Sequence, residues 1–406
     1  MTSITDFRVE NLRAGCVTDS KHPHFCWRVD SDGRNVSVSQ SKLTVNGWTC
    51  VTGDRLSADY EGETLKPFKE YKGMLSVTTD DGETAKSEIS FSTGRLDTPW
   101  QGKWISDPQY IFREKGVSPV PMVFKKKFSL KKRPLLARIY ITALGVYELR
   151  INNKKVGEDY FTPGFTSYSH NLQYQTYDVT DMLKTKEEGD NEIVVTVAGG
   201  WAVGSFVFTR KNRVNGDRQA LLAELRISCE DGCEEIIGTD EDWEVTEEGP
   251  LRSADLYDGE EYDACVAAGS MVFRKAAYER LRLDPKIQAG YGAPVREHET
   301  LYPIDKKRVG NEIIYDFGQN FAGIVFFKVK GKKGQVITIR HAEVLHPDGT
   351  LNTDFLRTAK ARIVYTCREG EQEYHPRFTY MGFRYISVTG IDEENITLYA
   401  KALYSD

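Results

Sequence analysis

The sequence predicts an all-β protein built from three consecutive β-sandwich domains. Three observations carry this prediction. Short runs alternate apolar with polar residues, turn residues such as Gly, Asn and Asp separate the runs, and helical periodicity is nearly absent. The chain has 406 residues, which is too many for one hydrophobic core, so several domains are expected.

The alternation is clearest in two predicted hairpins. In the strand predicted over 221–228, every second residue from Leu221 is apolar, and Asp231-Gly232 supplies the turn to its mate. In the strand predicted over 147–151, the turn to the next strand is Asn152-Asn153. A slip of one residue would turn each apolar face to solvent, so these pairings should be well specified.

A third pair of strands is predicted over 323–329 and 335–340, joined and paired through the Gly-Lys-Lys-Gly turn at 331–334. The one helix expected is one or two turns long, with Thr180 as its N-cap.

Two stretches interrupt the alternation and predict domain boundaries. Residues 93–100 break the first strand-rich block, and residues 282–303 carry three prolines without alternation, which indicates an extended connector. Trp27 is a candidate core tryptophan of the first block. The predicted domains are a fibronectin- or immunoglobulin-like sandwich over 1–97, a jelly-roll sandwich over 98–278 and a further sandwich over 279–406.

Composition excludes several classes of protein. Hydrophobic residues make up 40% and charged residues 28%, as in ordinary globular domains, and the net charge of -6 argues against a nucleic-acid partner. No apolar stretch is long enough for a membrane helix, and the N-terminus lacks a secretory leader, so a cytoplasmic location without a membrane partner is expected. Seven scattered cysteines fit reduced thiols better than a disulfide framework.

Ordered motifs along nearly the whole chain resemble the bacterial α-L-rhamnosidase family, glycoside hydrolase family 78. The densest are Pro163-Gly164-Phe165-Thr166-Ser167-Tyr168 and Gly199-Gly200-Trp201 in the middle block. Further matching segments are 9–12, 24–27, 91–94, 143–149, 156–159, 174–180, 257–264, 316–320, 342–345 and 382–385.

The resemblance implies a modular enzyme whose N-terminal β-sandwich domains precede a catalytic (α/α)6 barrel. A fibronectin-like domain, a jelly-roll domain related to rhamnose-binding modules and a further sandwich are expected here, while the acidic catalytic stretch of the barrel does not occur. Residues 402–406 resemble the family's linker into the barrel, so the missing barrel domain is an expected partner.

No catalytic residue is expected within the chain. Asp316, Glu343 and Asp348 are the carboxylates worth testing, and we interpret them as strand-end and interface residues. The acids at 258, 260, 261 and 263 could together supply oxygens to calcium, but a solvated strand is the preferred interpretation, so no cofactor and no metal site is predicted.

The middle block has side chains suited to a sugar, because aromatic rings stack on pyranose C–H faces while amides and acids bind hydroxyls. The candidate ligand-binding residues are Phe165, Tyr168, His170, Asn171, Trp201, Asn215 and Asp217, with Phe206, Phe208 and Asn212 nearby in sequence. Packing of the sandwich rim is the preferred interpretation of Phe165, Tyr168 and Trp201, and sugar binding is the alternative. The absence of a carboxylate from Ser169-His170-Asn171 argues against a calcium-assisted site.

The sequence therefore predicts the non-catalytic N-terminal part of an α-L-rhamnosidase-like hydrolase, inactive alone, which scaffolds the enzyme; binding of rhamnose-containing glycans is left open as a second role. Two alternatives stay open: a free-standing carbohydrate-binding protein, and one chain of a split rhamnosidase.

Overall fold

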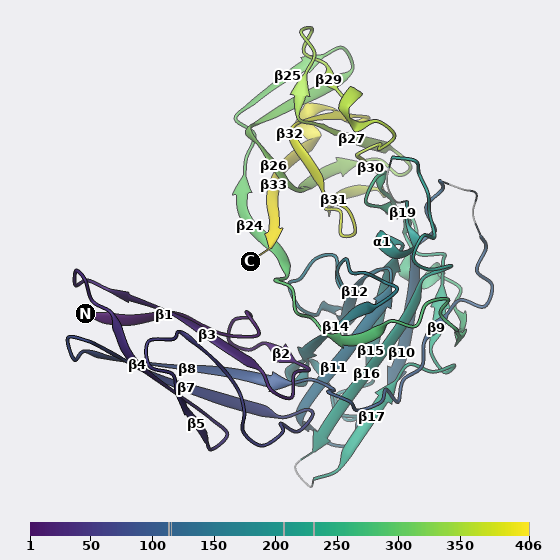
Figure 1. Cartoon of the computed structure of the whole chain (residues 1–406). Helices are drawn as coiled ribbons and strands as arrows, with labels where there is room; N and C mark the ends of the chain where they lie inside the picture. The colour runs from purple at the N-terminus through teal and green to yellow at the C-terminus, as the bar shows by residue number, and fades with distance from the viewer. Residues whose placement is uncertain (113, 115, 206–207, 230–231, 406) are drawn as a thin grey trace. The chain divides into compact units, whose positions relative to one another are not determined.

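The computed structural model describes residues 1–405 except 113, 115, 206–207 and 230–231. Over these residues nearly all regular structure is β-strand, which confirms the all-β prediction (Figure 1). The helical elements described are α1 (Gly200–Val203) and the 3-10 turns η1 (Thr180–Met182), η2 (Ala268–Ser270), η3 (Asp354–Leu356) and η4 (Glu393–Asn395). In the described part of the chain, no helix is long and apolar enough to cross a membrane.

Contacts divide the chain into two compact units. The first comprises Met1–Trp100 with two short returning segments, Gln173–Thr176 and Lys286–Ala293, and the second comprises the remaining residues. The second unit therefore holds most of the predicted middle and third blocks, and the boundary between those blocks stays a prediction.

The first unit is a two-sheet sandwich. One sheet runs in the order β1 (Thr2–Val9), β3 (His24–Ser31) and β6 (Ser57–Asp59), and the other in the order β2 (Val17–Thr18), β8 (Thr84–Thr93), β7 (Glu70–Thr79), β4 (Val38–Val45) and β5 (Trp48–Val51). Phe25 from one sheet meets Phe91 from the other with ring centroids 5.6 Å apart. Trp27 is buried in the same core, as predicted.

The second unit begins with a larger sandwich. One of its sheets has the order β13 (Lys154–Lys155), β12 (Val146–Ile151), β15 (Asn191–Ala198), β10 (Met122–Phe128), β18 (Glu244–Thr246) and β21 (Arg274–Lys275). The facing sheet has the order β22 (Ala277–Tyr278), β9 (Ile105–Ser106), β16 (Ala220–Cys229), β11 (Pro134–Leu144), β14 (Asn171–Asp178) and β23 (Lys286–Ala289), with β17 (Glu234–Gly238) paired to β16.

The alternating residues of this sandwich fill its core as the pattern predicts. Leu221, Ala223, Leu225 and Ile227 of β16 all lie in one buried cluster with Leu149 of β12. Both predicted hairpins form, since β16 pairs with β17 and β12 with β13. The turn residues at 230–231 lie outside the described residues, and Cys229 N donates to Cys233 O at 3.0 Å across that hairpin.

Near Thr180 the structure has a single 3-10 turn, and Thr180 does not cap it as predicted. Asp178 Oδ1 accepts hydrogen bonds from the backbone N–H and the hydroxyl of Thr180, at 3.0 and 2.6 Å. Thr180 Oγ1 instead accepts from Ala137 N. An aspartate two residues upstream supplies the acceptor that we expected from the threonine.

The third sandwich contains one ten-stranded sheet, with eight strands in a row and two more paired off that row. Its order is β19 (Leu251–Asp255), β20 (Gly259–Asp263), β30 (Arg362–Thr366), β27 (Val336–Ala342), β32 (Met381–Thr389), β26 (Glu312–Gly331), β33 (Ile396–Ser405) and β24 (Val295–Leu301), with β25 (Asp305–Val309) and β31 (Gly370–Tyr374) both paired to β26. A two-stranded ribbon of β28 (Val344–Leu345) and β29 (Leu351–Asn352) lies beside it.

Two expectations for this region need correction. The predicted strands at 323–329 and 335–340 exist, but they do not pair with each other: β32 lies between β26 and β27. The end of β26 pairs instead with β31, so the Gly-rich turn leads into a crossover and not a hairpin. The connector at 282–303 contains β24 and also β23 (Lys286–Ala289), because extended backbone between prolines can join a sheet edge.

The hairpin β19–β20 comes from the middle block, yet it completes the sheet of the third sandwich. β20 pairs in parallel with β30, with Glu260 opposite Ile363. Gly259 begins β20 at φ +95°, and a Cβ there would lie 1.8 Å from the Arg362 carbonyl oxygen, so only glycine fits.

A shared apolar cluster joins the two sandwiches of the second unit. It contains Tyr160, Phe161 and Leu251 from the middle block, together with Ile324 and Phe378 from the third. Glu260 lies beside it, fully buried. Its carboxylate accepts hydrogen bonds from Tyr374 Oη at 2.5 Å, Arg377 N at 2.8 Å and Phe378 N at 2.5 Å.

Glu148 is a second buried carboxylate at this joint between the two sandwiches. Arg377 Nη1 donates to Glu148 Oε1 at 2.8 Å, and Arg150 Nε donates to the same oxygen at 2.9 Å. Burial opposes ionisation of Glu148, but the charges of Arg377 and Arg150 outweigh it and hold its pKa below the usual value. Burial raises the pKa of Glu260 despite its three donors.

We expect Arg377→Met to destabilise the second unit by about 3 kcal/mol, because it removes a partner from the buried Glu148 carboxylate. Urea unfolding followed by tryptophan fluorescence measures this. The matched control is Lys306→Met, which removes an exposed 2.6 Å ion pair with Glu393 and should not shift the midpoint measurably. Equal shifts of the unfolding midpoint in both variants would mean that the buried Arg377–Glu148 pair stabilises the unit no more than an exposed ion pair does.

Candidate functional site

Three of the predicted sugar-binding residues gather in one place in the second unit. The Phe165 ring lies 5.9 Å from the Trp201 ring and 6.1 Å from the Tyr168 ring, measured between centroids. The sequence therefore identified rings that contact one another although 165 and 201 are far apart in the chain.

Two glycines hold Trp201 in position on the one-turn helix α1. Gly200 has φ +50°, and a Cβ there would lie 2.7 Å from Val146 Cγ1. A Cβ on Gly199 would lie 2.7 Å from Gly204 N. The Gly-Gly-Trp motif thus places a large ring directly after two positions where a Cβ would clash with neighbouring atoms.

The three rings differ in exposure, and this decides their roles. Tyr168 is 3% exposed and packs in a core cluster with Leu144 and Leu172, so it is a structural residue; burial raises the pKa of its hydroxyl. Trp201 is half-buried against two core clusters. Phe165 is 56% exposed and presents its ring to solvent.

Two rings that the sequence reasoning missed extend this group. Phe161 lies 6.3 Å from Trp201 and 5.2 Å from Tyr380, and Tyr380 is 40% exposed. We call Phe165, Trp201, Phe161 and Tyr380 the aromatic row. Phe161 stands two residues before the Pro163–Tyr168 motif, so its place in the sequence could have suggested it. Tyr380 comes from the third block, and only the fold brings it beside Phe161.

His170 and Asn171 form the turn after Tyr168. Their backbone N–H groups both donate to Ser167 O, at 2.7 and 2.8 Å, and Thr166 Oγ1 donates to Asn171 O at 2.6 Å. His170 is exposed and Asn171 is half-buried. Phe206 lies outside the described residues.

Asn215 and Asp217 have different positions relative to the row. Asn215 Nδ2 donates to Trp201 O at 3.2 Å, so Asn215 supports the tryptophan backbone. Asp217 Oδ1 accepts from Arg282 Nη1 at 3.2 Å in an exposed ion pair. The charge of Asp217 is therefore balanced by Arg282.

The three candidate acids of the third sandwich, Asp316, Glu343 and Asp348, each accept hydrogen bonds from neighbouring side chains. Asp316 is bound by both Arg384 Nε and Nη2, at 2.8 and 2.9 Å, and these hydrogen bonds hold its pKa below the usual value. Glu343 Oε1 accepts from Asn320 Nδ2 at 3.0 Å, and Asp348 Oδ1 accepts from the Thr350 hydroxyl at 2.7 Å. A general acid for glycoside cleavage needs a raised pKa, which Asp316 lacks.

One partly exposed carboxyl does have a raised pKa. Burial raises the pKa of Glu279, and the nearby Asp217 charge adds to this, against the opposing effect of Arg218. Arg218 Nε lies 3.6 Å from Glu279 Oε2. This acid is the natural target for a test of hydrolysis.

The acids at 258–263 do not gather into one cluster. Asp258 binds Arg210 and Lys360, Glu260 faces the buried joint, and Glu261 accepts from Arg362 at 2.9 Å. They point to different partners because residues of a strand alternate between its faces. Among the described residues, no group of three or more His, Cys, Asp or Glu side chains could hold a metal ion.

Comparison with known proteins gives three consecutive family matches along the chain. Residues 4–97 match the Rha78A-like N-terminal immunoglobulin domain, residues 132–286 the alpha-L-rhamnosidase N-terminal domain, and residues 306–404 the bacterial alpha-L-rhamnosidase concanavalin-like domain. The chain belongs to the α-L-rhamnosidase family.

Relatives of this chain support the same assignment. An alpha-L-rhamnosidase from Streptomyces avermitilis is 40% identical over 385 residues, covering 89% of this chain and 35% of that protein. One from Formosa agariphila is 33% identical, covering 82% of this chain and 38% of that protein. The chain thus spans between a third and two fifths of the length of these relatives.

Solved rhamnosidase structures share the fold. The alpha-L-rhamnosidase from Dictyoglumus thermophilum superposes with a TM-score of 0.87 at 29% identity, covering 99% of this chain and 49% of that one. A Streptomyces avermitilis alpha-L-rhamnosidase complexed with L-rhamnose also gives 0.87, at 24% identity, over 100% of this chain and 58% of that one.

We expect Gly200→Ala to destabilise the chain by about 2 kcal/mol, through left-handed backbone strain plus the clash with Val146, and to disturb the environment of Trp201. Gly334→Ala is the control, because Gly334 has φ +80° with nothing within 4 Å of its Cβ position, and backbone strain alone should cost about 1 kcal/mol. Urea unfolding and tryptophan fluorescence measure both effects. Equal losses for the two variants would contradict the close packing of α1 on Val146.

Proposed function

We propose that this chain is the accessory, non-catalytic part of an α-L-rhamnosidase, and that it holds a rhamnose-containing glycan for a separate hydrolytic domain. The observation that carries the proposal is that the candidate carboxyl groups already have hydrogen-bond partners within the protein or are buried. Glycosidases need two carboxyl groups that flank the scissile bond. The candidate acids of this all-β chain are instead bound to Arg384, Asn320 or Thr350, or buried in the domain joint.

The aromatic row supports the binding role. Rhamnose is a 6-deoxy sugar, so its methyl group and C–H faces offer apolar surface to an aromatic ring, while its hydroxyls need polar partners. Phe165 and Tyr380 are the exposed rings of the row, and His170 is an exposed polar side chain on the turn that follows Tyr168. The proposed contact is made by the exposed Phe165 ring together with the half-buried Trp201 ring beside it, and the sugar hydroxyls are directed to His170.

The proposal includes a cytoplasmic location. Its support is that Cys16, Cys26, Cys50, Cys229, Cys265 and Cys367 are free thiols, which suits a reducing compartment.

The purified chain should release no nitrophenol from 4-nitrophenyl α-L-rhamnoside above the buffer rate. The physical reason is that Asp316, Glu343 and Asp348 are bound to Arg384, Asn320 and Thr350, so none of these three described acids is set up for proton transfer to the leaving group. Sustained release that disappears in Glu279→Gln but persists in Glu343→Gln would overturn the non-catalytic assignment and place an acid near Asp217.

Phe165→Ala should weaken L-rhamnose binding about fivefold, since an aromatic contact contributes roughly 1 kcal/mol. Ligand-observed NMR titration measures the dissociation constant. Phe355→Ala is the matched control, because Phe355 is a 70% exposed ring elsewhere in the second unit and its loss should leave binding unchanged. Identical affinity in wild type and Phe165→Ala would exclude the aromatic row as the sugar site.

A further inference from the structure

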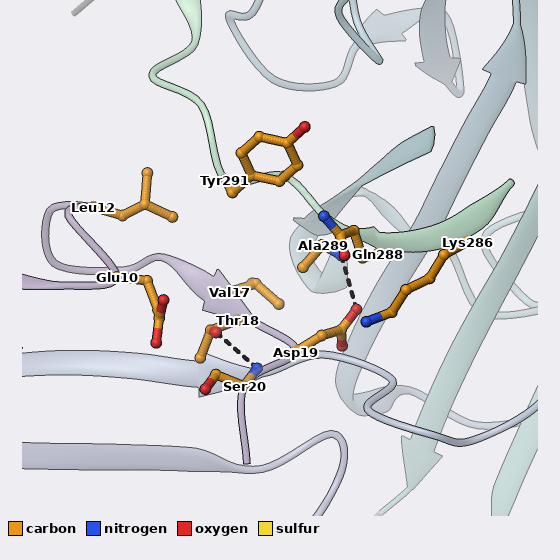
Figure 2. A pocket seen from close by; sticks show the side chains of 11 residues that line it. Glu10, Leu12, Val17, Thr18, Asp19, Ser20, Lys286, Gln288, Ala289 and Tyr291 are labelled. Atoms are coloured by element: carbon orange, nitrogen blue, oxygen red, sulfur yellow. Dashed lines mark hydrogen bonds between the residues drawn. The ribbon is translucent and has the colours of Figure 1, made fainter. Parts of the chain in front are cut away.

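A hollow of about 250 Å³ lies within the first unit, away from the aromatic row in the sequence (Figure 2). Its lining comes from the turn at Glu10–Leu12, from β2 and the residues after it, and from the returning segment that starts at Lys286. As Figure 2 shows, Glu10 and Leu12 stand on one side of the hollow, and Lys286 and Gln288 stand on the other.

The base of the hollow is rigid because Asp19 ties three segments together. Asp19 Oδ2 accepts a hydrogen bond from Ala289 N at 2.7 Å, and Oδ1 accepts from Tyr174 Oη and from Leu96 N, both at 2.8 Å. Three donors satisfy this carboxylate, so its charge is already compensated within the protein. Asp19 is therefore a positioning group and does not bind a ligand directly.

The polar groups around the rim are of four kinds. Glu10 supplies a carboxylate whose Oε1 accepts from His24 N at 2.8 Å, which fixes its direction. Lys286 supplies an exposed ammonium, Gln288 an amide and Ser20 a hydroxyl. A carboxylate has about four lone-pair sites, so Glu10 retains capacity to accept from a ligand hydroxyl.

An aromatic side chain completes the wall. Tyr291 is 50% exposed, and its backbone N–H donates to Gln173 Oε1 at 3.1 Å. Gly290 N donates to Tyr174 O at 3.0 Å, which holds the same stretch of backbone. The ring is thus carried on a fixed backbone and can be covered by a ligand at little entropic cost.

We propose that this hollow binds one neutral sugar residue, with Tyr291 against a pyranose face and Glu10, Lys286 and Gln288 on its hydroxyls. At the rim the Glu10 carboxylate and the Lys286 ammonium offset each other, and the Asp19 carboxylate at the base is already bound by three donors, so the lining favours an uncharged polyol over an anion or a cation. The volume lies below the roughly 300–1,000 Å³ of sites for drug-sized ligands, which matches one monosaccharide unit. This second sugar site goes beyond the proposed function and does not depend on the aromatic row.

The experiment uses the whole chain carrying Phe165→Ala, so that the aromatic row contributes little. Ligand-observed NMR titrations are run with methyl α-L-rhamnoside and methyl α-D-glucoside as neutral probes, with D-glucuronate as the anion and D-glucosamine as the cation. At least one neutral glycoside should saturate the protein with a dissociation constant in the millimolar range, and both charged sugars should bind at least threefold more weakly.

Added to that chain, Tyr291→Ala should weaken binding of the neutral glycoside about fivefold by removing the aromatic contact. Glu10→Gln should weaken it about threefold, because the amide keeps an acceptor for His24 N but loses the charge. Tyr278→Ala, a 55% exposed ring outside the lining, is the control and should change nothing.

Three results would overturn the proposal: no saturation by either neutral glycoside, glucuronate or glucosamine binding as tightly, or an unchanged dissociation constant in Tyr291→Ala. Wild-type unfolding midpoints for the variants exclude misfolding as the cause of a loss. Because Phe165 is already replaced, failure here leaves the test of the aromatic row untouched.

Discussion

The second unit depends on one buried carboxylate. Glu260 is removed from water at the point where two sandwiches meet, and a buried carboxyl group there is tolerated because Tyr374 and two backbone amides bind it while Arg377 supplies positive charge nearby. These donors come from the third sandwich and the acceptor comes from the middle block. The two sandwiches therefore share one polar network as well as one apolar cluster, and each would leave unsatisfied groups without the other.

Much of the fold was predictable because period-two alternation reports which side of a strand is buried. The alternation predicts both the strand and its partner for β12 and β16, because a short turn connects each of them directly to the next strand, β13 or β17. It fails for β26 and β27, because a sequence pattern gives strands but not their neighbours when a third strand, β32, is inserted from more than 40 residues further on. The same limit explains why β19 and β20 could not be assigned to the third sandwich.

The site was predictable in part, and for a related reason. Phe165, Tyr168 and Trp201 belong to motifs, so the sequence identified them, but exposure separates the buried Tyr168 from the accessible Phe165 and no pattern encodes that difference. Tyr380 joins the aromatic row only through the joint between sandwiches. Tyr291 and Glu10 carried no signal, since they meet when a connector returns to the first unit about 280 residues later in the chain.

The parallel pairing of β20 with β30 bears on how the protein is made. The two strands are about 100 residues apart, so a nascent chain that has produced β20 waits for much of the third sandwich before that pairing can form. During this interval β20 presents an open edge, and Glu260 lacks Tyr374 and Arg377. Co-translational folding of the second unit should therefore be late and cooperative, and the middle block is exposed to wrong pairing along β20 until β30 has been made.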